Sequence, residues 1–205
     1  NTATVIAVAD PTITTNPTAT QTLCVGGTPS ALTLAYSNGT GTAAYQWYSN
    51  TTNATTGGTL IAGATNASYT PPTLNTAGSY YYYGVATLSG SGCGAATSTS
   101  AEAIVIADPT ISTQPLTTQT LCSGGTVTAL TIAASGGTGT TTYQWYSNTN
   151  ADNTTGTSLG TSAQSATYTP SSASAGTTYY YCVVTNSNGC SITSSVSGAI
   201  TVAAA

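Results

Sequence analysis

The sequence predicts an all-β protein built from two tandem β-sandwich domains of about seven strands each. Three observations lead to this fold class. The chain is rich in threonine, with 48 Thr and 24 Ser in 205 residues, and Thr favours the pleated surface of a sheet. Short alternating apolar and polar segments are separated by clusters of Gly, Asn, Ser and Pro, as in β-sandwiches. The whole pattern also occurs twice along the chain.

The internal repeat has a period of about 98 residues. Gln21–Cys24 recurs as Gln119–Cys122, and Tyr45–Asn50 recurs as Tyr143–Asn148. This length suits one small sandwich domain. We therefore expect domains over residues 10–107 and 108–205. Residues 1–9 resemble the end of the first repeat, so we expect them to be the last strand of a preceding repeat.

The second repeat illustrates the expected strands in chain order. An opening strand lies around Ile111, and two further strands are separated by a glycine-rich turn. A fourth strand ends before a proline, a tyrosine-rich strand leads into an Asn-Gly hairpin, and the final strand ends near Val202. The segments after the opening strand are 129–133, 142–146, a strand ending at 168–170, 179–184 and the hairpin 186–189.

The charge composition excludes several functions. The chain has no Lys, Arg or His, and its net charge of −4 comes from four acidic residues. Nucleic-acid binding and polybasic membrane contact both need cations, so neither partner is expected. No apolar run is long enough to span a bilayer, so membrane insertion is not expected. Without His, Lys or Arg the usual proton carriers and oxyanion partners are missing, so we expect no enzyme, catalytic residue or cofactor.

Several residues resemble landmarks of the immunoglobulin fold. A Trp inside Tyr-Gln-Trp-Tyr matches the core tryptophan of that fold, and a Tyr two residues before a Cys matches its tyrosine corner. The resemblance makes Trp47 and Trp145 core residues and gives Tyr82 and Tyr180 the corner position. The departure is the disulfide, because strand B carries no Cys and Gly84 stands where the second repeat has Cys182.

The ordered motifs also resemble the Ig-like repeats of giant cell-surface adhesins of Bacteroidota, such as SprB-like gliding-motility adhesins. These motifs are Gln-Thr-Leu-Cys-x-Gly-Gly, Tyr-Gln-Trp-Tyr-Ser-Asn, a Tyr run after Gly, and a closing Gly-Cys. The resemblance implies type IX secretion, an extracellular, cell-surface location, and a stalk or filament that supports adhesion or gliding. The implied partners are neighbouring repeats of the same chain, with filament assembly a further possibility.

In such an extracellular context the cysteines predict structural disulfides. Each repeat has one Cys near its start and one near its end, which predicts Cys24–Cys93 and Cys122–Cys190 within the domains. Pairing of Cys93 with Cys122 across the domains stays open. Cys182 has Gly84 at its partner position, so we expect a buried thiol rather than a reactive one.

The acidic residues offer little chemistry. Asp10 and Asp108 each precede Pro at the start of a repeat, which favours a turn or capping role. Glu102 and Asp108 together supply too few oxygens for calcium, and they lie on a strand end and a linker rather than in a pocket. With no His and no CxxC, we expect no metal site.

The sequence thus favours a structural spacer with no chemistry of its own. The alternative is a ligand-binding module that recognises glycans or abiotic surfaces through Tyr, Asn and Thr in the loops 50–58 and 148–156. Such binding needs exposed aromatics. Strand alternation instead sends Tyr82 and Tyr180 inward, and Tyr81, Tyr83 and Tyr181 to the other face of the sheet.

Overall fold

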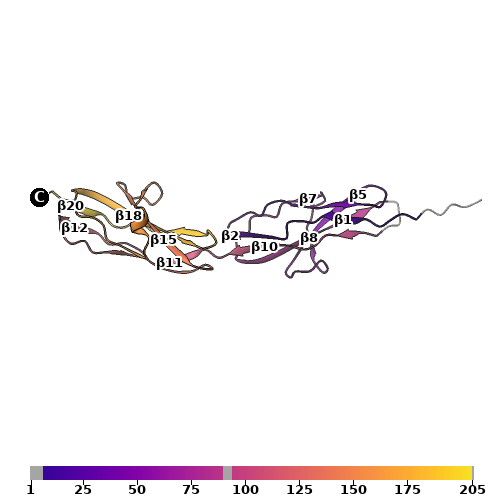
Figure 1. Cartoon of the computed structure of the whole chain (residues 1–205), viewed down its shortest axis with the longest axis horizontal. Coiled ribbons are helices and arrows are strands. Elements are labelled where there is room, and N and C mark those ends of the chain that lie inside the picture. Colours follow the sequence, from indigo (N-terminus) through magenta and orange to yellow (C-terminus); the bar gives the residue numbers. More distant parts are fainter. Residues whose placement is uncertain (1–6, 90–93, 205) are drawn as a thin grey trace, which may run out of the picture. The chain divides into compact units, whose positions relative to one another are not determined.

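The computed structural model describes residues 7–89 and 94–204, which form two compact units with a boundary between Val105 and Ile106. Both units are built of β-strands (Figure 1). The described residues contain no α-helix and one 3-10 turn, η1 (Thr161–Ala163), so no helix there has the length and apolar character to cross a membrane. Most of the strand predicted over residues 1–9 lies outside the described residues.

The larger sheet of unit 2 contains the tyrosine-rich strand at its centre. Its order is β12-β20-β18-β15-β16, and β19 also pairs with β18. The outermost pair, β12 with β20, is parallel, whereas the pairs that β18 makes are antiparallel. The strand bounds are Gln119–Cys122 (β12), Thr141–Asn148 (β15), Thr157–Ser158 (β16), Gly176–Asn186 (β18), Ser191–Thr193 (β19) and Ile200–Ala203 (β20).

The second layer of unit 2 consists of two short antiparallel pairs. One is β11 (Pro109–Thr113) with β14 (Ala133–Gly136), and the other is β13 (Leu130–Thr131) with β17 (Thr167–Tyr168). β13 and β14 are pieces of one run interrupted at Ile132, whose backbone N–H donates to Ala166 O at 2.9 Å. The run alternates apolar and polar residues, so its apolar side chains face the larger sheet.

Unit 1 repeats this topology element by element. Its larger sheet has the order β2-β10-β8-β5-β6 with β9 beside β8, and its second layer consists of the pairs β1-β4 and β3-β7. The prediction of tandem Ig-like sandwiches is therefore confirmed. The bounds are Thr12–Thr15 (β1), Thr20–Cys24 (β2), Leu32–Thr33 (β3), Ala35–Ser37 (β4), Ala43–Asn50 (β5), Thr59–Leu60 (β6), Ser68–Tyr69 (β7), Gly78–Leu88 (β8), Ala96–Thr97 (β9) and Ala101–Ile106 (β10).

Each unit encloses its own apolar core between the two layers. Trp47 and Trp145 are completely buried at the centres of these cores. Their neighbours on the second layer include Leu32 in unit 1 and Leu130 in unit 2, both at most 2% exposed. Each core cluster is made of residues from one unit, so burial of apolar surface stabilises each unit from within.

Candidate functional site

The aromatic residues that could bind a ligand form a triad around the buried tryptophan in each unit. In unit 1 the indole of Trp47 lies 5.9 Å from the ring of Tyr69, which lies 6.0 Å from the ring of Tyr82. The indole N–H donates to Asn66 O at 2.9 Å, so the one polar atom of the tryptophan is satisfied inside the fold. Burial, helped by Tyr69, raises the pKa of Tyr82 to about 12. The indole of Trp47 is enclosed, whereas Tyr69 is only partly buried and lines, together with Tyr82, a hollow of about 430 Å³.

Unit 2 repeats the triad with almost the same geometry. Trp145, Tyr168 and Tyr180 lie with ring centres 5.9 and 5.6 Å apart, and the indole N–H donates to Ser165 O at 2.8 Å. Burial also raises the pKa of Tyr180. Tyr82 and Tyr180 are 5% and 6% exposed, so both contribute to the cores rather than to a surface.

The tyrosines on the opposite face of the sheet are covered as well. Tyr83 stacks on Tyr48 at 5.1 Å, and Tyr181 stacks on Tyr146 at the same distance. Alternation along the strand indicated that Tyr83 and Tyr181 point to this face, but it gave no sign that both are only 4% exposed there. A loop closes over them in each unit.

The covering loops are the segments 50–58 and 148–156, which the sequence singled out as candidate binding loops. The backbone N–H of Gly58 donates to the Tyr83 hydroxyl at 3.3 Å, and that of Gly156 donates to the Tyr181 hydroxyl at 3.1 Å. A Cβ at Gly58 would lie 2.8 Å from the Tyr83 ring, so only glycine allows this close approach. The signal in the sequence is the recurrence of Asn and Gly eight residues apart.

An asparagine at the start of each loop holds the loop in place. The Asn50 side-chain amide donates to Ala54 O and Thr56 O, both at 3.1 Å. The Asn148 amide donates to Thr155 Oγ1 at 3.1 Å. These donors are therefore used within the loop and are not presented to a ligand.

Asp152 gives the loop of unit 2 an additional anchor. Its carboxylate accepts hydrogen bonds from the backbone N–H groups of Thr154 and Thr155, at 2.9 and 3.0 Å, and from the Thr155 hydroxyl. These bonds lower the pKa of Asp152 to about 2. The arrangement is an Asx turn, which is a structural use of a carboxylate.

A shallow polar hollow lies beside each loop. The hollow in unit 1 measures about 240 Å³ and that in unit 2 about 370 Å³. Equivalent positions line both, although Gly57 and Tyr80 of unit 1 correspond to Thr155 and Thr178 of unit 2, and all of the residues are neutral. The lining residues are Ser49, Asn50, Thr51, Gly57, Thr59 and Tyr80 in unit 1, and Ser147, Asn148, Thr149, Thr155, Thr157 and Thr178 in unit 2.

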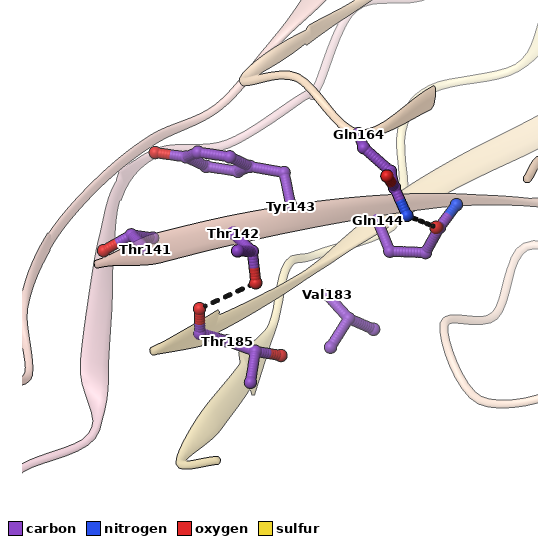
Figure 2. A pocket seen from close by; sticks show the side chains of 7 residues that line it. All are labelled: Thr141, Thr142, Tyr143, Gln144, Gln164, Val183 and Thr185. Atoms are coloured by element: carbon purple, nitrogen blue, oxygen red, sulfur yellow. Dashed lines mark hydrogen bonds between the residues drawn. The ribbon is translucent and has the colours of Figure 1, made fainter. Parts of the chain in front are cut away.

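A further hollow of about 360 Å³ lies over β15 and β18 of unit 2 (Figure 2). Gln164 donates its amide N–H to Gln144 Oε1 at 3.1 Å, and the Gln144 amide nitrogen donates to Trp145 O and Gly160 O. Figure 2 shows Tyr143 on the other side of the strand from Thr142. The amide of Gln144 is thus occupied internally on both its oxygen and its nitrogen.

The predicted disulfide between Cys122 and Cys190 is wrong, because Cys122 carries a free, exposed thiol. In the strand register Cys122 of β12 lies beside Ala203 of β20, at one end of the larger sheet. The backbone N–H of Cys190 donates to Asn186 Oδ1 at the far end of β18. About ten residue steps of roughly 3.3 Å separate these ends along β18. A disulfide needs Cα atoms within about 7 Å, so the two cysteines cannot meet inside the domain.

The remaining cysteines differ in state. Cys24 and Cys190, which belong to different units, are each disulfide-bonded. Cys93 lies outside the described residues, and with it the predicted Cys24–Cys93 bridge. The alternative pairing of Cys93 with Cys122 is wrong, because Cys122 is a free thiol. Cys182 is a buried thiol, as predicted, and burial raises its pKa to about 11. A thiol held in its neutral form is a poor nucleophile and metal ligand.

The acidic residues of unit 1 accept hydrogen bonds from other parts of the described chain. Glu102 Oε1 accepts from the Tyr81 hydroxyl at 3.0 Å, and Asp10 Oδ1 accepts from the backbone N–H of Gly94 at 3.0 Å. The second contact joins residues 84 positions apart, so it is a long-range bond and not the local turn or capping contact expected for Asp10. Neither carboxylate lies among the residues that line the hollows.

Sequence reasoning missed a pair of buried serines beside the core. The hydroxyl of Ser98 accepts from Gly84 N at 2.9 Å, and the hydroxyl of Ser194 accepts from Cys182 N at the same distance. Each serine is at most 2% exposed. Ser98 follows β9 and Ser194 follows β19, and each hydroxyl accepts a hydrogen bond from a backbone N–H of the neighbouring strand where the β9 or β19 pairing ends. Nothing in the sequence distinguishes these two serines from the others.

Comparison with known proteins gives one family match and several structures of similar fold. The sequence model of a family described as a domain of unknown function (DUF8696) matches residues 13–107 and 111–204. A search of curated proteins finds no match.

Three solved structures illustrate the similarity of fold. Immunoglobulin domains 1–4 of Sidekick-1 match 99% of this chain at 16% identity with a TM-score of 0.49, and the chain spans 51% of that fragment. The fibronectin(III)-like modules of Clostridium thermocellum CbhA match 95% of the chain and 94% of theirs, at 17% identity and a TM-score of 0.41. The tandem Ig repeats of Dlar match 95% of the chain and 98% of theirs, at 20% identity and a TM-score of 0.37.

Proposed function

Because the chain belongs to the DUF8696 family and carries its domain twice, we propose that these domains are structural spacer repeats of a secreted cell-surface protein. The observation that carries this proposal is that the tryptophans and the asparagine amides make their contacts within the domain. Trp47 and Trp145 are enclosed in the cores, and the asparagine amides that line the hollows bond to their own loops. A repeat of this kind acts through its length and stability.

One further feature supports a location outside the cell, and another supports the spacer role. Cys24 and Cys190 are disulfide-bonded, and structural disulfides persist in oxidising compartments. The surface is solvated by Thr and Ser hydroxyls with almost no charge, so neighbouring stalks attract or repel each other little through charge. The motifs shared with Bacteroidota adhesins extend the proposal to a stalk that displays adhesive parts, exported by the type IX route, in adhesion or gliding.

A binding assay on the 205-residue chain separates this role from ligand recognition. The chain, labelled at its N-terminus, is applied to a glycan array and to glass and polystyrene surfaces. The spacer role predicts no retention above that of an inert protein of the same size. Saturable binding to one glycan class would overturn the proposal. Loss of that binding in Gln164→Ala or Asn148→Ala would then identify which hollow is responsible.

A second measurement tests the mechanical part of the proposal. Stretching the chain in a single-molecule force experiment is expected to give two separate unfolding events, because each unit has its own core. The disulfides of Cys24 and Cys190 are first reduced with dithiothreitol, since a disulfide prevents the chain that it encloses from extending. The contour length released per event should match a domain of about 100 residues at roughly 3.5 Å per residue. A chain that extends without such events would contradict a load-bearing spacer.

A further inference from the structure

Cys122 occupies a defined position at one end of unit 2. It is the last residue of β12, it pairs with Ala203 of the parallel strand β20, and it is exposed. The Gly124 that follows adopts a left-handed φ of 78°, and Gly125 N donates back to Cys122 O at 2.9 Å. The turn fixes the backbone of the cysteine at the tip of the sheet.

The equivalent residue of unit 1 has the same local structure. Cys24 ends β2, Gly26 has a φ of 81°, and Gly27 N donates to Cys24 O at 2.9 Å. Cys24 is disulfide-bonded, whereas Cys122 has a free thiol. The same backbone conformation thus holds one cysteine that is in a disulfide and one that is not.

The other cysteine position of the domain lies at the opposite end. Cys190 follows the hairpin after β18, and its backbone N–H and C=O both bond to Asn186. Cys190 is also disulfide-bonded. Because about ten steps of β18 separate the two positions, each cysteine can pair only with a residue from outside its own domain.

We propose that Cys122 is a docking point for another domain of the same family, and that its sulfur bonds to the cysteine at the Cys190 position of that domain. The two thiols lose two protons and two electrons to a disulfide oxidant, which is reduced to two thiols. The sequence neighbours of both cysteines are uncharged, and the one carboxylate near the Cys190 sulfur in unit 2 is that of Asp108, within 4.8 Å. Cys122 has no carboxylate beside it in the sequence, so one charged group at most faces the junction. The inference stands apart from the spacer role, since a ligand-binding array could be joined in the same way.

The test extends the array by one domain. Residues 108–205 are attached directly after Ala204, so that Asp108 of the added copy takes the place of Ala205. This keeps the natural spacing, because Val105 pairs with Gly78 in unit 1 and Val202 pairs with Gly176 in unit 2. The protein is oxidised with glutathione disulfide, alkylated, digested with elastase and mapped by mass spectrometry without reduction.

The expected result is a linked peptide that joins Cys122 to the cysteine of the added copy at the Cys190 position. Cys122→Ser should remove that peptide, and the matched control Cys182→Ser should leave it unchanged. An alkylated Cys122 in the oxidised array, or a Cys122 bound only to glutathione, would overturn the proposal. So would a linkage of Cys122 to Cys190 of its own unit.

The unextended chain provides a second, independent measurement. Iodoacetamide added to the folded protein should alkylate Cys122 completely before any of Cys182 reacts, since only the former is exposed. Cys182 should react only after unfolding in urea. Protection of Cys122 in the folded chain would contradict its role as an open attachment point.

Discussion

The two units fill the space beside their tryptophan in different ways. In unit 1 Gly84 pairs with Trp47, and a Cβ at Gly84 would overlap the Cδ2 methyl of Leu34. In unit 2 Cys182 pairs with Trp145, and the residue equivalent to Leu34 is Ile132. A longer side chain on one layer therefore accompanies a missing side chain on the other. The repeats thus place different side chains, of different shape, in the space beside the tryptophan.

Truncating either tryptophan should have the largest effect and should test whether the two cores are equivalent. Trp145→Ala removes a fully buried indole and is expected to destabilise unit 2 by about 3–5 kcal/mol. Hydrogen exchange of the β18 amides, followed by mass spectrometry, measures this loss. The matched variant Trp47→Ala should have the same effect on the β8 amides of unit 1. Equal acceleration of exchange in both units by one variant would contradict separate cores.

A side chain placed at Gly84 would disturb the close packing between this glycine and Leu34 in unit 1. Gly84→Cys gives unit 1 the side chain found in unit 2, and we expect overpacking against Leu34 to cost about 1–3 kcal/mol. Adding Leu34→Ile should recover most of this loss, because the pair then matches that of unit 2. The readout is again exchange of the β8 amides. Full stability of Gly84→Cys alone would show that the two positions are not coupled.

The positions that sequence reasoning predicted well are those governed by strand alternation. Trp47 and Tyr82 follow from alternation because inward and outward positions differ by one residue, whatever the partner strand. The complementarity of Gly84 and Leu34 could not be foreseen in this way. The two residues lie 50 positions apart in the sequence, and only the layered fold brings them into contact.

The cysteines show a second limit of the sequence. Nearly equal spacing suggested that Cys122 and Cys190 pair, since spacing records distance along the chain. It does not record at which end of a strand each residue lies. The parallel pairing of β12 with β20 places Cys122 at one end of the sheet, and the hairpin after Asn186 places Cys190 at the other. Such a parallel pair gives no local signal in the sequence.

Removing the loop anchor should have a smaller effect that is alike in the two units. Tyr83→Phe and Tyr181→Phe each delete the hydroxyl that accepts a hydrogen bond from a loop glycine. The expected loss is about 0.5–1.5 kcal/mol, because the stacked ring stays in place. Faster hydrogen exchange should appear in residues 51–58 or 149–156 of the altered unit. An unchanged loop would mean that stacking alone holds it.

The smallest expected effect is a difference between the two loops in how their stability responds to pH. Asp152 has a folded-state pKa of about 2, below the ordinary value near 3.9, so its hydrogen bonds stabilise the loop above about pH 4. That stability is lost as the pH falls through about 2. The equivalent residue of unit 1 is Ala54, so its loop should not respond in this range.

A carboxyl ¹³C titration by nuclear magnetic resonance tests this difference, with Asp152→Asn assigning the signal. The Asp152 carboxyl and the amides of Thr154 and Thr155 should titrate together with a midpoint near pH 2, because those amides donate to the carboxylate. The amides of Thr56 and Gly57, at the equivalent positions of unit 1, should stay unchanged. A midpoint near the ordinary value would mean that the Asx turn does not hold the carboxylate in solution, and the two loops would then differ in sequence but not in stability.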